Sequence, residues 1–395
     1  MSDSTVNNDA RSASSKNYEW LIQITNAGTK ETTHDDNQRK GPAFPKVPST
    51  FRDIQQNSDC YDPSVVSIGP YHHGNTKLKE MEKLKETYAR EFVKDAEKPI
   101  DDIYREMEAV LRIAKNSYPE DARRDFNDEQ FAVMMFIDGC FIVQFLFCLY
   151  MKPGNLKMSS HDAALKPGSQ NSDENSYSFL RSSSCLSCWN RAQGKDNKIF
   201  CELPRSLTLG SSQGAAPDQP AAHLLELLHK QFCSRTIVPE QSEKSSFKND
   251  SQMNWYRYYP AEELRSIGIH FKPSKTGLFT DVQFKRRWLI SRGLYIPPLR
   301  IDNSTKSLLL NLVAYEACHG ESNESRVTSY VCFMDSLIDT PRDVQVLRSK
   351  GILLNTLGSD EQAAELFNQI ASRLIPDPYA YIQVKSSIEK EHRKS

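Results

Sequence analysis

Two adjacent histidines, His72 and His73, are the first residues whose types could do chemistry, because imidazoles bind metals and transfer protons. They end the apolar stretch VVSIGPYHHG at residues 65–74. Adjacent side chains on an extended segment point in opposite directions and rarely converge on one ion. No third metal ligand is evident nearby, so the pair does not by itself indicate a metal or catalytic site.

The residues around the two histidines are typical of a tight loop. The candidate motif residues at this point, besides the histidines, are Gly69, Pro70, Tyr71 and Gly74. Glycine reaches backbone conformations that other residues avoid, and proline fixes its own φ angle. We therefore predict a loop whose geometry depends on the two glycines and the proline.

A single carboxyl group, that of Asp138, lies inside the apolar stretch FIDGCFIVQFL, where Gly139 and Cys140 follow it directly. A buried carboxyl group has a shifted pKa, and such groups can be functional. The commoner arrangement is a structural carboxylate that is paired or accepts hydrogen bonds, and this is our prediction for Asp138. The alternative is an enzyme site in which Asp138 and either His72 or His73 meet across the fold.

The spacing Cys185-x-x-Cys188 resembles half of a zinc site, which Cys201 or Cys233 could extend. A structural zinc site needs a second close pair of ligands, and none appears. The chain has nine cysteines, an odd number, scattered among apolar residues. We predict reduced thiols rather than a zinc site or a set of disulfides.

A second spacing, His223-x-x-Glu226-x-x-His229, puts two imidazoles and a carboxylate on one side of a helix. Leucines and Phe232 occupy the other side, so the polar side is predicted to face solvent. The chain contains no Walker A loop, GxSxG elbow, HExxH helix or dinucleotide-binding fingerprint. The sequence therefore predicts no metal, no cofactor and no catalytic residues.

The nearly equal numbers of basic and acidic residues indicate which classes of partner to expect. Lys and Arg total 50 and Asp and Glu total 51, which gives a net charge of −1 at pH 7. Nucleic acid is not an expected partner, since no global positive field attracts it. The N-terminus, MSDSTVNNDARSASSKN, has no basic and apolar signal pattern, so we expect an intracellular protein, cytoplasmic or peripheral to a membrane.

The segment 131–150 is apolar on nearly all sides and about long enough to cross a bilayer. Asp138 near its middle would cost roughly 2.5–3.5 kcal/mol there. Asn127 and Gln130 form a capping-box pattern at its start. We predict a buried central helix, with a membrane-associated structural protein as the alternative if this helix is exposed.

Hydrophobic periodicity and start signals predict most of the other elements. Helices are predicted at about 75–96, 101–115, 127–150, 223–233, 304–319, 326–339, 341–349 and 359–373. Between them, IHF, GLFTDVQF and RWLISRGLYIPPL indicate a small sheet or two to three short strands. The fold class is mostly α with a small β element (α+β), a helical core around a buried central helix with long disordered insertions.

Shifts in composition predict the organisation of the chain. We expect a mostly disordered segment at 1–44, an N-terminal helical half of one domain at 45–150, a low-complexity insertion at 151–221, the C-terminal half of that domain at 222–385, and a polar tail at 386–395.

Several stretches resemble, in order and spacing, the plant domain-of-unknown-function 247 family, also called uncharacterised protein family 0481. In the N-terminal half they are VPSTFRD, YDPSVVSIGPYHHG, LKEMEKLKETYAREF and FIDGCFIVQFL. In the C-terminal half they are GIHFKP, LYIPPLRIDNSTKSLLLNLVAYE, VTSYVCFMDSLIDTPRDVQVLRSKGIL and LGSDEQAAELFNQI. Pro297 and Pro298 of LYIPPL join the candidate motif residues on this ground. The resemblance covers about 45–150 and 222–385.

This resemblance implies a plant-specific, largely helical protein with no established catalytic activity. Some grass members of the family are associated with pollen–stigma self-incompatibility, which implies a protein partner. Members usually end in an apolar membrane helix, whereas this chain ends at YIQVKSSIEKEHRKS. Membrane association is therefore left open.

Together these observations predict a non-enzymatic protein-interaction or recognition protein. The motifs consist of aromatic, proline and glycine residues rather than a converging acid, base and nucleophile. The polar insertion would then carry partner specificity, because variable loops on a rigid scaffold often do so.

Overall fold

The computed structural model describes residues 44–96, 99–151, 224–233, 259–287, 291–319 and 325–395. The predictions for the N-terminal segment before residue 44, for most of the insertion at 151–221 and for Cys185, Cys188 and Cys201 lie outside these residues.

The N-terminal half is helical and begins with short turns. Its elements are α2 (Ser49–Arg52), η1 (Ser58–Tyr61), η2 (Pro70–His72), η3 (Thr76–Leu78), α3 (Lys79–Asp95), α4 (Ile100–Ser117), α5 (Glu120–Arg123) and α6 (Asp128–Met151). The predicted helices at 75–96, 101–115 and 127–150 are confirmed as α3, α4 and α6.

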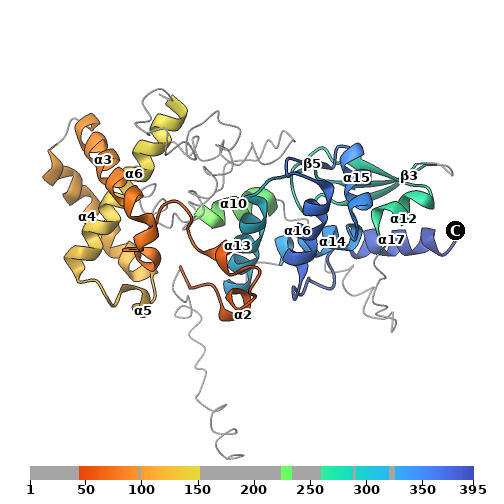
Figure 1. Ribbon diagram of the computed structural model, residues 1–395, viewed down its shortest axis with the longest axis horizontal. Helices are drawn as coiled ribbons and strands as arrows, with labels where there is room; N and C mark the ends of the chain where they lie inside the picture. Colours follow the sequence, from red (N-terminus) through yellow and green to blue (C-terminus); the bar gives the residue numbers. More distant parts are fainter. Residues whose placement is uncertain (1–43, 97–98, 152–223, 234–258, 288–290, 320–324) are drawn as a thin grey trace, which may run out of the picture. The chain divides into compact units, whose positions relative to one another are not determined.

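Helix α6 is the central element of this half. It begins with the predicted capping box, because Gln130 N–H donates to Asn127 Oδ1 (2.7 Å) and Asn127 N–H donates to Gln130 Oε1 (3.1 Å). It packs against α3 and α4, beside which it lies in Figure 1. Most side chains from Phe131 to Phe145 are buried, so this stretch is a core helix as predicted. Within the described ranges, no helix is both long and apolar enough to cross a bilayer.

The C-terminal half combines helices with two small sheets. Its elements are α10 (Leu224–Cys233), α12 (Ala261–Ser266), β1 (Ile269–Pro273), β2 (Gln283–Arg287), β3 (Ser291–Ile296), β4 (Leu299–Ile301), α13 (Thr305–Cys318), α14 (Arg326–Leu337), α15 (Pro341–Ser349), β5 (Leu353–Asn355), α16 (Asp360–Ala371) and α17 (Ile382–His392). This composition confirms the predicted class, mostly α with a small β element.

The strands are more numerous than predicted. In the first sheet β3 lies between β1 and β2, parallel to β1 and antiparallel to β2. In the second sheet β4 pairs in parallel with β5, with Leu299 opposite Leu353. The expected two to three strands between 269 and 299 are four strands in 269–301, and β5 was not predicted at all.

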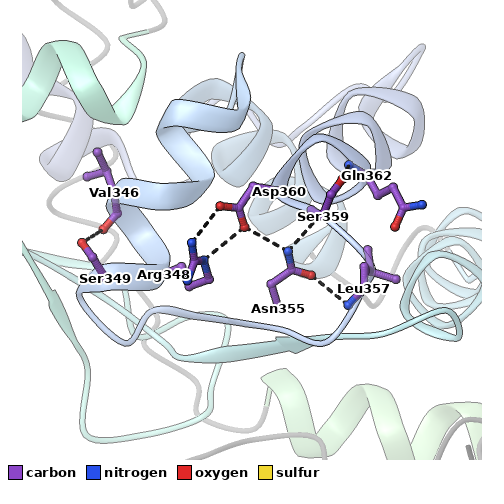
Figure 2. A network of polar contacts seen from close by, with 8 residues as sticks. All are labelled: Val346, Arg348, Ser349, Asn355, Leu357, Ser359, Asp360 and Gln362. Atoms are coloured by element: carbon purple, nitrogen blue, oxygen red, sulfur yellow. Dashed lines mark hydrogen bonds and ion pairs between the residues drawn. The ribbon is translucent and has the colours of Figure 1, made fainter.

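Polar side chains fix the connection from α15 through β5 to α16 (Figure 2). Arg348 donates two hydrogen bonds to the Asp360 carboxylate, at 3.1 and 2.9 Å. Asn355 Nδ2 donates to Asp360 Oδ1 and to the Ser359 carbonyl, and its Oδ1 accepts from Leu357 N–H. These contacts satisfy backbone groups in the turn that precedes α16.

The segment at 386–395, expected as a polar tail, forms most of helix α17 and packs on the sheet. Glu391 lies buried with its carboxylate 2.7 Å from Arg292 and 3.5 Å from Arg286. The ring of His392 stacks on Tyr259 with centroids 4.0 Å apart. Charge pairing with residues much earlier in the chain is the reason why this polar sequence is ordered.

Candidate functional site

The Gly69–Gly74 loop follows the first apolar run, as the sequence predicts. Gly69 has φ of 75°, a left-handed conformation that favours glycine, and its N–H donates to Asp138 Oδ2 at 2.8 Å. Pro70 is buried and opens the 3-10 turn η2. Gly74 also has a positive φ, of 80°. The two glycines and the proline therefore set the loop geometry.

Asp138 is the buried, paired carboxylate that the sequence predicts. It is 1% exposed, and Lys85 Nζ lies 2.5 Å from its Oδ1. Lys85 also donates to the Ser67 carbonyl at 2.9 Å and contacts Glu82 at 2.7 Å. Burial lowers the pKa of Lys85, but the carboxylates of Asp138 and Glu82 outweigh it and raise the pKa overall. Asp138 thus links the loop to helices α3 and α6.

The neighbours of Asp138 serve the core. Gly139 and Cys140 are buried on α6, and burial raises the pKa of the Cys140 thiol to about 12. A thiol with such a pKa is protonated at neutral pH and is a poor nucleophile.

The two histidines of the loop diverge. His72 is half-buried and lines a cavity, with its Nε2 3.9 Å from Asp62 Oδ1. His73 is exposed and its ring packs edge-on against Phe126 at a centroid distance of 5.5 Å. Asp138 does not line the cavity that His72 lines. The three residues of the alternative enzyme site are therefore not brought together in this cavity.

The cavity has a volume of about 530 Å³ and lies between the segment 44–72 and helix α13. Its apolar lining includes Phe44, Val47, Tyr61, Ile68, Tyr71, Leu225, Ala314 and Tyr315. Most of these residues belong to the stretches VPSTFRD, YDPSVVSIGPYHHG and NLVAYE or lie next to them. Those stretches carry the family resemblance, although only Tyr71 and His72 among the lining residues were predicted as motif residues.

Two hydrogen bonds connect α13 to the opposite side of the cavity. Lys306 Nζ donates to the Gln56 carbonyl at 2.8 Å, and Asn311 Nδ2 donates to the Cys60 carbonyl at 2.9 Å. Both acceptors belong to the segment around η1. The cavity is therefore formed by two regions of the chain that are about 250 residues apart.

The polar groups of the cavity are mostly paired with one another. Arg52 donates to Asp62 at 2.5 Å, and Tyr71 Oη donates to the Phe44 carbonyl at 2.5 Å. Burial lowers the pKa of His72, an effect that the Asp62 carboxylate opposes. Tyr61 differs: it is 7% exposed, and its hydroxyl has no hydrogen-bond partner among the described residues.

The Cys318 thiol, which lines the cavity, is not an activated nucleophile. Burial raises the pKa of Cys318, whose Sγ lies 3.7 Å from the Lys46 carbonyl. His319 has its Nδ1 2.9 Å from the Tyr315 carbonyl, and its ring packs on the Tyr315 ring at 4.3 Å. The Cys318 thiol therefore lacks the lowered pKa of a reactive cysteine.

Pro297 and Pro298 lie away from the cavity, in the connection between β3 and β4. Both are buried, and the Pro297 carbonyl accepts a hydrogen bond from Tyr330 Oη at 3.3 Å. Proline lacks the N–H that would continue strand pairing, so the two residues separate the two sheets.

The prediction of a solvent-facing polar side on the helix at 223–233 is wrong for His229. Its side chain is buried, and its Nε2 lies 2.8 Å from Glu316 Oε1 on α13. Helix α13 covers this side of α10, and Glu316 provides a polar partner there. Glu226 is half-buried and pairs with Lys230 at 2.5 Å, whereas His223 lies outside the described residues.

A search of protein families matches residues 45–395 to DUF247, described as "Plant protein of unknown function". A UPF0481 protein of Arabidopsis thaliana is 26% identical over 375 residues, which cover 84% of this chain and 72% of the relative. Another UPF0481 protein of the same plant is 37% identical over 106 residues, or 27% of this chain and 19% of that relative. No solved structure matches the chain.

Proposed function

The chain belongs to the plant DUF247 family, a family of unknown function, and we propose that it is a non-enzymatic interaction protein whose cavity receives an apolar side chain of a protein partner. The observation that carries this proposal is the cavity lining, which combines aromatic and aliphatic groups, among them Phe44, Tyr71 and Tyr315, with polar side chains at its edge. A concave site with aromatic walls fits a large aromatic side chain of the kind that dominates protein interfaces.

The state of the reactive groups favours binding over catalysis. Asp138 is enclosed by Lys85 and the Gly69 N–H, away from the cavity. The Cys318 thiol in the cavity has a raised pKa, whereas a nucleophilic cysteine requires a lowered one. The cavity therefore offers contact surface rather than an activated nucleophile.

The partner that we propose is a protein. The net charge of −1 gives no support for nucleic acid, whose binding requires concentrated positive charge. Recognition between pollen and stigma, with which some grass members of the family are associated, is one role that fits a protein partner. We further propose that the polar residues 151–220 contribute partner-specific contacts.

The test is to fill the cavity without altering the rest of the surface. Ser307 on α13 lines the cavity, so Ser307→Phe places a ring inside it. Ser386 on α17 is half-buried and does not line the cavity, so Ser386→Phe is the matched control. Tagged full-length chains carrying each substitution, and a chain lacking residues 151–220, are used for pull-down from the plant tissue that expresses the protein, with mass spectrometry as the readout.

We expect a defined set of partners with the unaltered chain and with Ser386→Phe, and at least tenfold less of that set with Ser307→Phe. Loss of the set on deletion of 151–220 assigns partner specificity to that segment. Equal recovery with Ser307→Phe and Ser386→Phe contradicts a binding role for the cavity, provided that both variants have the circular dichroism spectrum of the unaltered chain.

A further inference from the structure

Three buried side chains of different chemistry converge between α10 and α13. His229 and Cys233 are four residues apart on α10, so they occupy the same side of the helix one turn apart. Glu316 of α13 faces them. One ligand atom from each residue, an imidazole nitrogen, a thiol sulfur and a carboxylate oxygen, lies within 4.8 Å of the other two.

We propose that His229, Cys233 and Glu316 bind one zinc ion. Nitrogen, sulfur and oxygen donors of these residue types are the ligands that zinc uses in proteins, and a fourth position is completed by water. Burial raises the pKa of the Cys233 thiol in the metal-free protein, so its proton leaves to solvent only as the ion binds. One thiolate and one carboxylate then balance the two positive charges of the ion. This site lies outside the proposed function and is tested independently of it.

The groups around Glu316 are arranged as the outer contacts of a metal ligand usually are. Its Oε2 accepts from Thr328 N–H at 2.9 Å and from Thr328 Oγ1 at 2.7 Å, and its Oε1 accepts from Val327 N–H at 2.7 Å. Such contacts orient a ligating carboxylate and raise metal affinity. The ion replaces only the 2.8 Å contact between His229 Nε2 and Glu316 Oε1.

The other contacts of α10 keep the ligands in position. Phe232 stacks on Phe279 with centroids 4.7 Å apart, and the Phe232 carbonyl accepts from Phe279 N–H at 2.8 Å. The Cys233 carbonyl accepts from Arg326 at 2.9 Å. Two ligands therefore come from a helix that is already fixed at its C-terminal end, which lowers the entropic cost of binding an ion.

The same geometry is compatible with a metal-free carboxylate that caps the start of α14 and accepts from His229. Metal content distinguishes this metal-free arrangement from the proposed zinc site. The full-length protein is purified without chelator and its zinc content measured by mass spectrometry, then stripped and titrated with Co²⁺, whose thiolate complexes absorb in the near ultraviolet. We expect one equivalent of zinc and one equivalent of cobalt with the thiolate absorption band.

Substitutions locate the ion. Cys233→Ser is expected to remove the thiolate band, whereas Cys332→Ser on α14 keeps it. Combined Cys185→Ser and Cys188→Ser is also expected to keep it, which excludes the Cys-x-x-Cys pair as the source. Thr328→Val removes one contact to Glu316 and is expected to weaken Co²⁺ binding about 10–100-fold.

A zinc content near zero in the purified protein, with no thiolate band on Co²⁺ titration, overturns the proposal and leaves the metal-free cap. Persistence of the band in Cys233→Ser overturns it as well. If Cys233→Ser does not fold, the unaltered protein still decides: its thermal unfolding midpoint must fall on treatment with a chelator and recover on addition of Zn²⁺.

Discussion

Asp138 on α6 and Glu316 on α13 are both buried carboxylates that accept a backbone N–H from another part of the chain. Asp138 accepts from Gly69 and faces the ammonium of Lys85. Glu316 accepts from Val327 and Thr328 at the start of α14 and faces the imidazole of His229. The buried carboxylate of the N-terminal half is therefore stabilised by a lysine ammonium. That of the C-terminal half is stabilised by a helix N-terminus and a histidine.

The different surroundings of Asp138 and Glu316 show that burial of a carboxyl group does not by itself indicate a functional site. Asp138 is fully enclosed with Lys85, and burial raises the pKa of its carboxyl group against the opposing effect of the Lys85 ammonium. The pair acts as a structural link. Glu316 instead lies beside the imidazole of His229 and the thiol of Cys233, two groups that can serve as metal ligands. Of these two carboxylates, only that of Glu316 lies in a cluster of potential metal ligands within the described part of the chain.

The largest effect is expected from Asp138→Asn, which leaves the Lys85 ammonium buried opposite an uncharged group. We expect the free energy of unfolding to fall by about 3–5 kcal/mol, as when one partner of a buried pair is removed. Urea denaturation measures it, with the exposed Asp125→Asn as the matched control.

Combining Lys85→Met with Asp138→Leu sharpens this test. Replacing both charges by apolar groups is expected to recover much of the loss, because the fully buried ammonium is gone and only the partly exposed Glu82 carboxylate loses a partner. A double variant as unstable as Asp138→Asn would show that hydrogen bonds to Gly69 and Ser67, rather than charge pairing, account for the effect.

A smaller loss is expected from Glu316→Gln. The amide presents an NH₂ group to donors of α14, so the free energy of unfolding should fall by roughly 2–3 kcal/mol. The measurement is made with chelator present, so that any metal contribution is absent from both proteins. A change below about 0.5 kcal/mol contradicts the role of this carboxylate at the start of α14.

An exposed pair gives the next smaller effect. Arg348 and Asp360 form a two-point contact (Figure 2), but the Arg348 side chain is 48% exposed. Arg348→Ala should lower the free energy of unfolding by about 0.5–1 kcal/mol, less at high salt. Arg265, whose contact with Glu262 is 3.9 Å long, provides the control, and Arg265→Ala should have almost no effect.

The smallest expected change is an increase in the free energy of unfolding, on substitution of Asp335. Burial, reinforced by Asp339, raises the pKa of Asp335 from 3.8 to about 6. The folded state therefore binds this proton more tightly, and the stability that the proton contributes is present below pH 4 and is lost as the pH rises through 6. Asp335→Asn should stabilise the protein above pH 6, by about 1 kcal/mol or less after allowance for solvent screening, and have little effect below pH 4. Unfolding measured at both pH values tests this, and equal effects at the two contradict it.

Elements with local signals were predictable from the sequence. The Asn127–Gln130 capping box marks the start of α6, and Pro341 in the first turn marks the start of α15. The loop of Gly69 and Pro70 was also predictable, because backbone geometry depends on these residue types alone.

Features that depend on distant partners could not be predicted. Strand β5 has only three residues, and it forms by pairing with β4, whose residues lie 54 positions earlier in the chain. His229 is buried because Glu316, 87 residues later, provides its partner. Helix α17 buries only Val384 and Ile388 among its apolar residues, too few for a clear periodic pattern. The cavity was missed for the same reason, since its two sides lie far apart in the chain.

The hydrogen bonds from Lys306 to Gln56 and from Asn311 to Cys60 also have a consequence for biosynthesis. They join residues 250 and 251 positions apart. At about 5–20 residues per second, a ribosome needs on the order of 10–50 s to proceed from one side of each contact to the other. During that interval the segment 44–64 leaves the ribosome before the helix against which it will pack exists, so the cavity is completed late in translation.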